Sequence, residues 1–125
     1  DLLNEIKDKN IKIGLASASK NAVMVLKNLD LYDYFNFIAD AAKCKNSKPD
    51  PEIFIMAANG LSVDNINCIG IEDASAGIEA INAANMYSVA IGDKLILNKA
   101  KLIFEDTSQL SFEEIIKNYK CVKYC

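Results

Sequence analysis

Three short segments of the sequence combine residue types that could bind a phosphate group or a metal ion. The first is Ser17-Ala18-Ser19-Lys20-Asn21, in which hydroxyl groups, an ammonium group and an amide stand directly before a predicted helix. Free backbone N–H groups at a helix N-terminus add further donors for an anion. We interpret this segment as a candidate anion site. The simpler alternative is that Ser19 caps the helix and Lys20 is solvated.

The second segment places a lysine directly before a rigid helix start, in the sequence Ser-Lys-Pro-Asp-Pro-Glu at positions 47–52. Pro49 favours an extended backbone at Lys48. An ammonium group held in this way can act as a point charge on a phosphate. Taken alone, a lysine in such a position is more often an ordinary surface lysine.

The third segment follows an apolar run, Cys-Ile-Gly-Ile at positions 68–71, and carries two adjacent carboxylates, Glu72 and Asp73. Mg²⁺ prefers oxygen ligands and retains several water molecules, so this pair is a candidate magnesium site. The alternative is that Asp73 caps the next helix and Glu72 is exposed. The serine segment, the lysine and the acids together supply donors, a positive charge and metal ligands, which phosphoryl transfer requires.

Composition excludes several other kinds of chemistry. The 125 residues contain no histidine, and all 14 basic side chains are lysines. A histidine-dependent serine or cysteine hydrolase mechanism and a histidine-ligated zinc site are therefore excluded within this chain. The net charge of −3 gives no indication of nucleic-acid or membrane-surface binding. The sequence shows no signal peptide or membrane-length apolar run, so we expect a cytoplasmic location.

The elements that must position these residues alternate between strands and helices. The predicted strands are short runs of apolar residues without polar alternation, which is typical of strands buried on both faces. They predict a parallel sheet with helices on both faces, in one α/β domain over residues 1–125. In such folds ligands bind beyond the carboxyl ends of the strands, where the three segments fall. The predicted strands are 11–16, 37–39, 67–71, 88–91 and 102–104, and the predicted helices are 1–9, 20–29, one beginning at 50–52, 74–85 and 111–119.

Local signals refine three of these helices. For the helix at 20–29, the pattern predicts Val23 and Leu26 facing inward, with Val25 as a further candidate. Asp50 is suited to cap the next helix and Pro51 to its first position. Ser111, followed three residues later by Glu114, predicts a capping box at the start of the last helix.

With these motifs in place, the sequence resembles the haloacid dehalogenase superfamily, and within it the β-phosphoglucomutase group. Residues 13–21 look like the second motif of that superfamily, residues 47–54 like the third, and residues 70–81 like the fourth. The resemblance extends from the first predicted strand to about Gly92. It implies a Rossmann-like core domain that transfers phosphoryl groups with Mg²⁺ as cofactor.

The resemblance also implies a role for each matching residue. Ser17 and the Ala18 N–H group would hold the transferring phosphate, Lys48 would neutralise it, and Glu72 and Asp73 would bind Mg²⁺. Ser19, Lys20 and Asn21 would contact the second phosphate of a phosphorylated sugar, as in the mutases. The implied activity interconverts β-glucose 1-phosphate and glucose 6-phosphate through a phosphoaspartate. A sugar-phosphate phosphatase of the same superfamily, or a non-catalytic fragment that binds metal or phosphate, remains an alternative.

The sequence departs from the superfamily at its first motif. The Asp-x-Asp pair that supplies the nucleophile does not occur in these residues, and neither does the helical cap domain. We therefore expect a fragment that is inactive alone and lacks the central strand between those ending at Ala16 and Ile71. A further expectation is that the missing N-terminal segment acts as a partner. A second, smaller departure is Asn85, where relatives have glycine and where asparagine tolerates a left-handed backbone.

Overall fold

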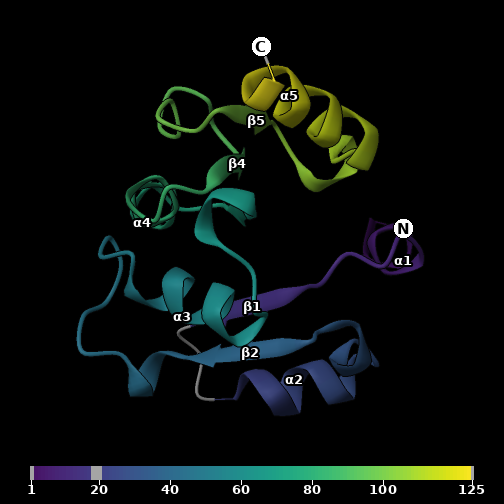
Figure 1. Ribbon diagram of the computed structural model, residues 1–125, viewed down its shortest axis with the longest axis vertical. Coiled ribbons are helices and arrows are strands. Elements are labelled where there is room, and N and C mark those ends of the chain that lie inside the picture. Colours follow the sequence, from purple (N-terminus) through teal and green to yellow (C-terminus); the bar gives the residue numbers. More distant parts are fainter. Residues whose placement is uncertain (1, 18–20, 125) are drawn as a thin grey trace.

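The computed structural model describes residues 2–17 and 21–124, which form two parallel sheets (Figure 1). The first sheet contains β1 (Gly14–Ser17) and β2 (Phe37–Asp40), and the second contains β3 (Ile69–Glu72), β4 (Tyr87–Ile91) and β5 (Leu102–Phe104). All three strand pairings are parallel, with β4 in the centre of the second sheet. This confirms the predicted parallel α/β fold.

The helices are α1 (Leu2–Asp8), α2 (Ala22–Asn28), α3 (Glu52–Gly60), α4 (Ser75–Ala83) and α5 (Phe112–Tyr124). Each predicted helix is present, and α5 continues five residues beyond the predicted end. The strand predicted from residue 67 begins at Ile69, because Asn65–Asn67 form a 3₁₀ turn closed by a hydrogen bond from Cys68 N–H to the Asn65 carbonyl. None of the helices in the described part of the chain is long and apolar enough to cross a membrane.

Helices cover both faces of the second sheet, as the prediction requires. One buried cluster joins α3, α4 and β4 and includes Ala58, Ile81 and Ala90. A second cluster on the other face joins β4 and β5 to α5 and includes Val89 and Ile115. Gly70 allows α4 to lie close to β3, because a Cβ atom there would be 2.7 Å from Cγ1 of Ile81.

The two sheets are separate. Among the described residues, β1 pairs only with β2 and β3 pairs only with β4, so β1 and β3 each have one edge without a strand partner. The predicted gap between these two strands is therefore confirmed, and the described strands do not close it. Helix α3, which packs on β1 and β2 and contacts α4, connects the two halves (Figure 1).

The inward face predicted for the helix at 20–29 is largely wrong. Leu26 is buried, but Val23 is 41% exposed and Val25 is 47% exposed. Met24, between them, is also exposed. The apolar residues of α2 lie on several sides of a short helix, and the described chain packs against the side that carries Leu26.

The predicted helix caps are confirmed in part: the N-cap position of α3 belongs to Pro51, one residue after the predicted Asp50, although Asp50 still binds the start of the helix. The Asp50 carboxylate accepts a hydrogen bond from the Glu52 N–H group at 2.9 Å, and Pro51 has helical backbone angles. The Ser111 hydroxyl accepts from the Glu114 N–H group at 3.2 Å, as in a capping box. Asn85 has a φ of +62°, which is the left-handed conformation expected after α4.

Candidate functional site

The second and third candidate segments meet through Lys48 and Glu72. Lys48 Nζ lies 2.6 Å from Glu72 Oε2 in a charged hydrogen bond. The Lys48 side chain is 25% exposed and the Glu72 side chain 14% exposed, so the pair is largely shielded from water. Because Glu72 is the last residue of β3, this contact stands at the carboxyl edge of the second sheet. Lys48 is therefore not an ordinary surface lysine.

The loop that carries Lys48 is held in place by Glu52, in the first turn of α3. Glu52 Oε2 accepts a hydrogen bond from the Lys45 N–H group at 2.8 Å, and Oε1 accepts from the Asn46 N–H group at 3.0 Å. The Lys48 ammonium group also lies 5.1 Å from the centre of the Phe54 ring, which permits a cation–π interaction. These contacts fix the position of the Lys48 side chain at the carboxyl edge of the second sheet.

The charge state of Glu52 follows from this arrangement. The hydrogen bonds that its carboxylate accepts from the Lys45 and Asn46 backbone lower the pKa of Glu52 below its usual value. Hydrogen bonds to the ionised form favour that form. Glu52 is therefore a carboxylate at neutral pH and holds the loop through its charge as well as its shape.

Glu72 folds back over the start of α4. Its Oε1 accepts a hydrogen bond from the Asp73 N–H group at 3.1 Å. The cap position of α4 belongs to Ala74 and not to Asp73, so the alternative of a capping Asp73 with an exposed Glu72 is wrong. Asp73 itself is exposed to solvent. The two adjacent carboxylates thus differ, one being paired and shielded and the other open.

The donor chemistry of this pair suits a hard cation. Glu72 and Asp73 offer carboxylate oxygens, and Mg²⁺ is often held by one or two carboxylates together with water and substrate phosphate oxygens. Within residues 2–17 and 21–124, no group of three or more acidic, histidine or cysteine side chains could hold a metal ion. The described residues therefore suit a Mg²⁺ ion that takes no more than two carboxylate ligands from them, those of Glu72 and Asp73.

The serine segment is only partly described. Ser17 is the last residue of β1, half-buried and in register with Asp40 of β2. Asn21 directly precedes α2, and its carbonyl accepts a hydrogen bond from the Val25 N–H group. Ala18, Ser19 and Lys20 lie outside the described residues. The structure thus brings Lys48 into contact with Glu72, which Asp73 follows in the chain, and it places Ser17 at the carboxyl end of the other sheet.

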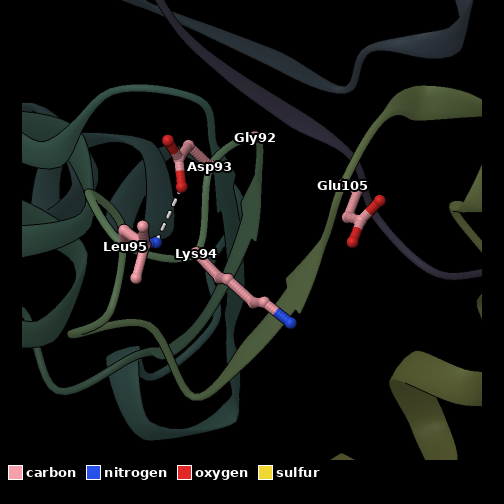
Figure 2. Close-up of a pocket in the computed structure, with 5 residues that line it drawn as sticks. All are labelled: Gly92, Asp93, Lys94, Leu95 and Glu105. Atoms are coloured by element: carbon pink, nitrogen blue, oxygen red, sulfur yellow. Dashed lines mark hydrogen bonds between the residues drawn. The ribbon is translucent and has the colours of Figure 1, made fainter.

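Sequence interpretation did not identify an open hollow on the same edge of the second sheet (Figure 2). It has a volume of about 330 Å³ and lies where β4 and β5 end. Asp93 Oδ1 accepts a hydrogen bond from the Leu95 N–H group at 2.8 Å, which shapes the loop after β4 (Figure 2). The Gly-Asp turn after a predicted strand was the available signal. Its lining residues are Gly92, Asp93, Lys94, Leu95 and Glu105.

Comparison with known proteins identifies a family for the chain. The model of the haloacid dehalogenase-like hydrolase family matches residues 1–91. That range contains all of the candidate residues, including Lys48, Glu72 and Asp73.

Three relatives illustrate the similarity. The β-phosphoglucomutase of Bacillus subtilis strain 168 is 45% identical over 112 residues, which is 90% of this chain and 50% of that protein. The crystal structure of β-phosphoglucomutase from Clostridium difficile superposes with a TM-score of 0.96 at 58% identity, covering 99% of this chain and 56% of that one. Hexitol phosphatase B of Escherichia coli K12 is 33% identical over 111 residues, 87% of this chain and 50% of that protein. The chain thus spans about half the length of these relatives.

Proposed function

The chain belongs to the haloacid dehalogenase-like hydrolase family, and on that premise we propose that it serves a magnesium-dependent β-phosphoglucomutase. The proposed reaction interconverts β-glucose 1-phosphate and glucose 6-phosphate. Two of the relatives described above, from Bacillus subtilis and Clostridium difficile, carry the name β-phosphoglucomutase at 45% and 58% identity. These similarities favour the mutase over other activities of the family.

The observation that carries the proposal is the contact between Lys48 and Glu72. The Lys48 ammonium group and the Glu72 carboxylate face each other in a position shielded from water. The ammonium group can bind an anion, and the carboxylate can bind a cation. A cation bound at Glu72 would replace the Lys48 charge there, and a phosphate oxygen bound at Lys48 would replace the Glu72 charge. A site for a magnesium–phosphate pair requires this adjacency, because the metal and the lysine act on the same phosphoryl group.

We assign the following roles to the residues of this chain. Lys48 neutralises the transferring phosphate, and Ser17 with the Ala18 N–H group orients it. Glu72 and Asp73 hold Mg²⁺, which when bound supplies charge stabilisation for the transferred group. A second set of donors binds the other phosphate of the sugar and consists of Ser19, Lys20 and Asn21.

The nucleophile in this proposal lies outside the 125 residues, because they contain no Asp-x-Asp pair. A phosphoaspartate needs such a carboxylate, so the 125-residue chain alone is expected to be inactive. The chain itself acts as a core domain over residues 1–125, completed by a segment bearing that motif. The proposed location is the cytoplasm, and the proposed small-molecule partner is a phosphorylated sugar.

A sugar-phosphate phosphatase is the second candidate function. The observation that favours it is the similarity to hexitol phosphatase B of Escherichia coli, at 33% identity over 87% of this chain. A phosphatase would use the same lysine and carboxylates but would pass the phosphoryl group to water instead of to a sugar hydroxyl. A role limited to binding phosphate or metal is the third alternative.

Product analysis separates these functions. The protein with its nucleophile-bearing segment is incubated with β-glucose 1-phosphate and Mg²⁺, and ³¹P NMR follows the phosphorus species. We expect glucose 6-phosphate to accumulate in wild type and to be lost in Lys48→Met, while Lys99→Met remains active. Release of inorganic phosphate as the main product would instead support the phosphatase, and no turnover would support the binding role.

A further inference from the structure

Gly77 stands inside helix α4, where glycine is less favourable than alanine. It is buried, and a Cβ atom at this position would lie 2.0 Å from Glu72 Cγ, 2.2 Å from Cδ and 2.3 Å from Oε2. These separations are far below van der Waals contact. The space above Gly77 is therefore occupied by the Glu72 side chain, from Cγ to the carboxylate.

The surroundings of the other glycines show that this arrangement is specific. A Cβ atom at Gly60 would meet the Phe37 ring, and one at Gly70 would meet the Ile81 side chain. Those two glycines allow apolar packing. Of the five glycines, all within the described residues, Gly77 is the one whose added Cβ would meet a carboxylate.

We propose that Gly77 is a positioning residue, which forms the slot that directs the Glu72 carboxylate toward Lys48. This inference rests on the proposed function for its catalytic meaning. Within the slot, Oε1 is fixed by the Asp73 N–H group and Oε2 faces Lys48 Nζ. A side chain at position 77 would displace both oxygens from these partners.

Whether the helix or the Glu72 side chain moves depends on how firmly each of them is held. The helix backbone is held by Ile78, Ala80 and Ile81, which are at most 1% exposed. Glu72, by contrast, meets Gly77 through the outer atoms of a flexible side chain. Gly77→Ala should therefore retain the fold and move Glu72, whereas Gly60→Ala should strain apolar packing and leave Glu72 in place.

The first test is a double-mutant cycle on the 125-residue chain, measured as the urea midpoint of unfolding. We expect Gly77→Ala to lower the midpoint when Glu72 is present and to raise it in the Glu72→Ala background. In that background the slot is empty and alanine favours the helix. The same shift in both backgrounds would overturn the proposal.

The second test observes the Glu72 carboxyl carbon directly by ¹³C NMR. Lys48→Met should change its chemical shift in the wild-type and Gly60→Ala backgrounds but not in Gly77→Ala, where the carboxylate has already left the lysine. An unaltered response in Gly77→Ala would refute the positioning role. Neither test uses Mg²⁺, phosphate or sugar, so a failure of the proposed mutase activity is distinguishable from a failure of this inference.

Discussion

Lys48 and Glu72 are 24 residues apart in the sequence, and their side chains meet at 2.6 Å at the carboxyl edge of the second sheet. Lys48 comes from the loop before α3, and Glu72 ends β3. The contact therefore joins the loop before α3, the helix that packs on the first sheet, to a strand of the second sheet. The same ion pair therefore belongs to the candidate site and contributes to the stability of the fold.

Removal of Lys48 should destabilise the protein measurably. Lys48→Met leaves the shielded Glu72 carboxylate without its cation, and we expect the free energy of unfolding to fall by about 1–2 kcal/mol. This lies between the values for exposed and buried pairs. Urea unfolding at neutral pH measures the change.

The matched control is Lys99→Met. Lys99 forms an ion pair with Glu79 at 3.0 Å, but the two side chains are 69% and 45% exposed. We expect a change of at most about 0.5 kcal/mol. Equal losses in Lys48→Met and Lys99→Met would contradict the view that the Lys48–Glu72 pair is a shielded one.

The pH dependence of stability should reveal Glu52. Its pKa is lowered in the folded state by hydrogen bonds from the Lys45 and Asn46 backbone. As the pH falls, the unfolded chain takes up the proton first, so the contribution of Glu52 is complete above the usual glutamate pKa of about 4.3 and decreases below it. We expect wild type to lose more stability between about pH 5 and pH 3 than Glu52→Gln does.

Glu113→Gln serves as the charge-matched control for this measurement. Glu113 is an exposed carboxylate in the first turn of α5, far in the sequence from the Lys48 loop. This variant should keep the acid-induced loss of wild type. If Glu52→Gln and Glu113→Gln lose stability alike, Glu52 does not hold the loop through its charge.

The two sides of α2 should respond differently to truncation. Leu26 is 8% exposed, and Leu26→Ala should lower the free energy of unfolding by about 2–3 kcal/mol. Val25 is 47% exposed, and Val25→Ala should change it by less than about 1 kcal/mol. Chemical denaturation of both variants checks the difference. A large loss from Val25→Ala would restore the inward face that the sequence pattern predicted.

Signals within a few residues of each other predicted much of the fold. Asp50 and Ser111 bind backbone N–H groups at the starts of their helices, and such contacts are predictable because they join groups two or three residues apart. The strands that end at Ser17 and Glu72 were recognisable as short apolar runs. The polar residues directly after these runs could therefore be placed at the carboxyl ends of the strands.

Features that depend on distant parts of the chain could not be predicted in this way. The pattern placed Val23 inward, but which side of α2 is covered depends on segments remote in the sequence. The slot above Gly77 depends on where the Glu72 side chain turns after the strand ends, which no spacing rule gives. A glycine inside a helix was the available signal for it.

A magnesium titration tests whether Glu72 and Asp73 bind the ion. The backbone amide signal of Asp73, whose N–H group donates to Glu72, is followed by ¹⁵N NMR as Mg²⁺ is added to wild type, Asp73→Asn and Asp93→Asn. The latter removes a carboxylate from the neighbouring strand end, outside the proposed site. We expect a saturable shift at residue 73 in wild type and Asp93→Asn that is strongly weakened in Asp73→Asn. Equal titration of all three proteins, or no response in wild type, would show that Glu72 and Asp73 do not form the magnesium site.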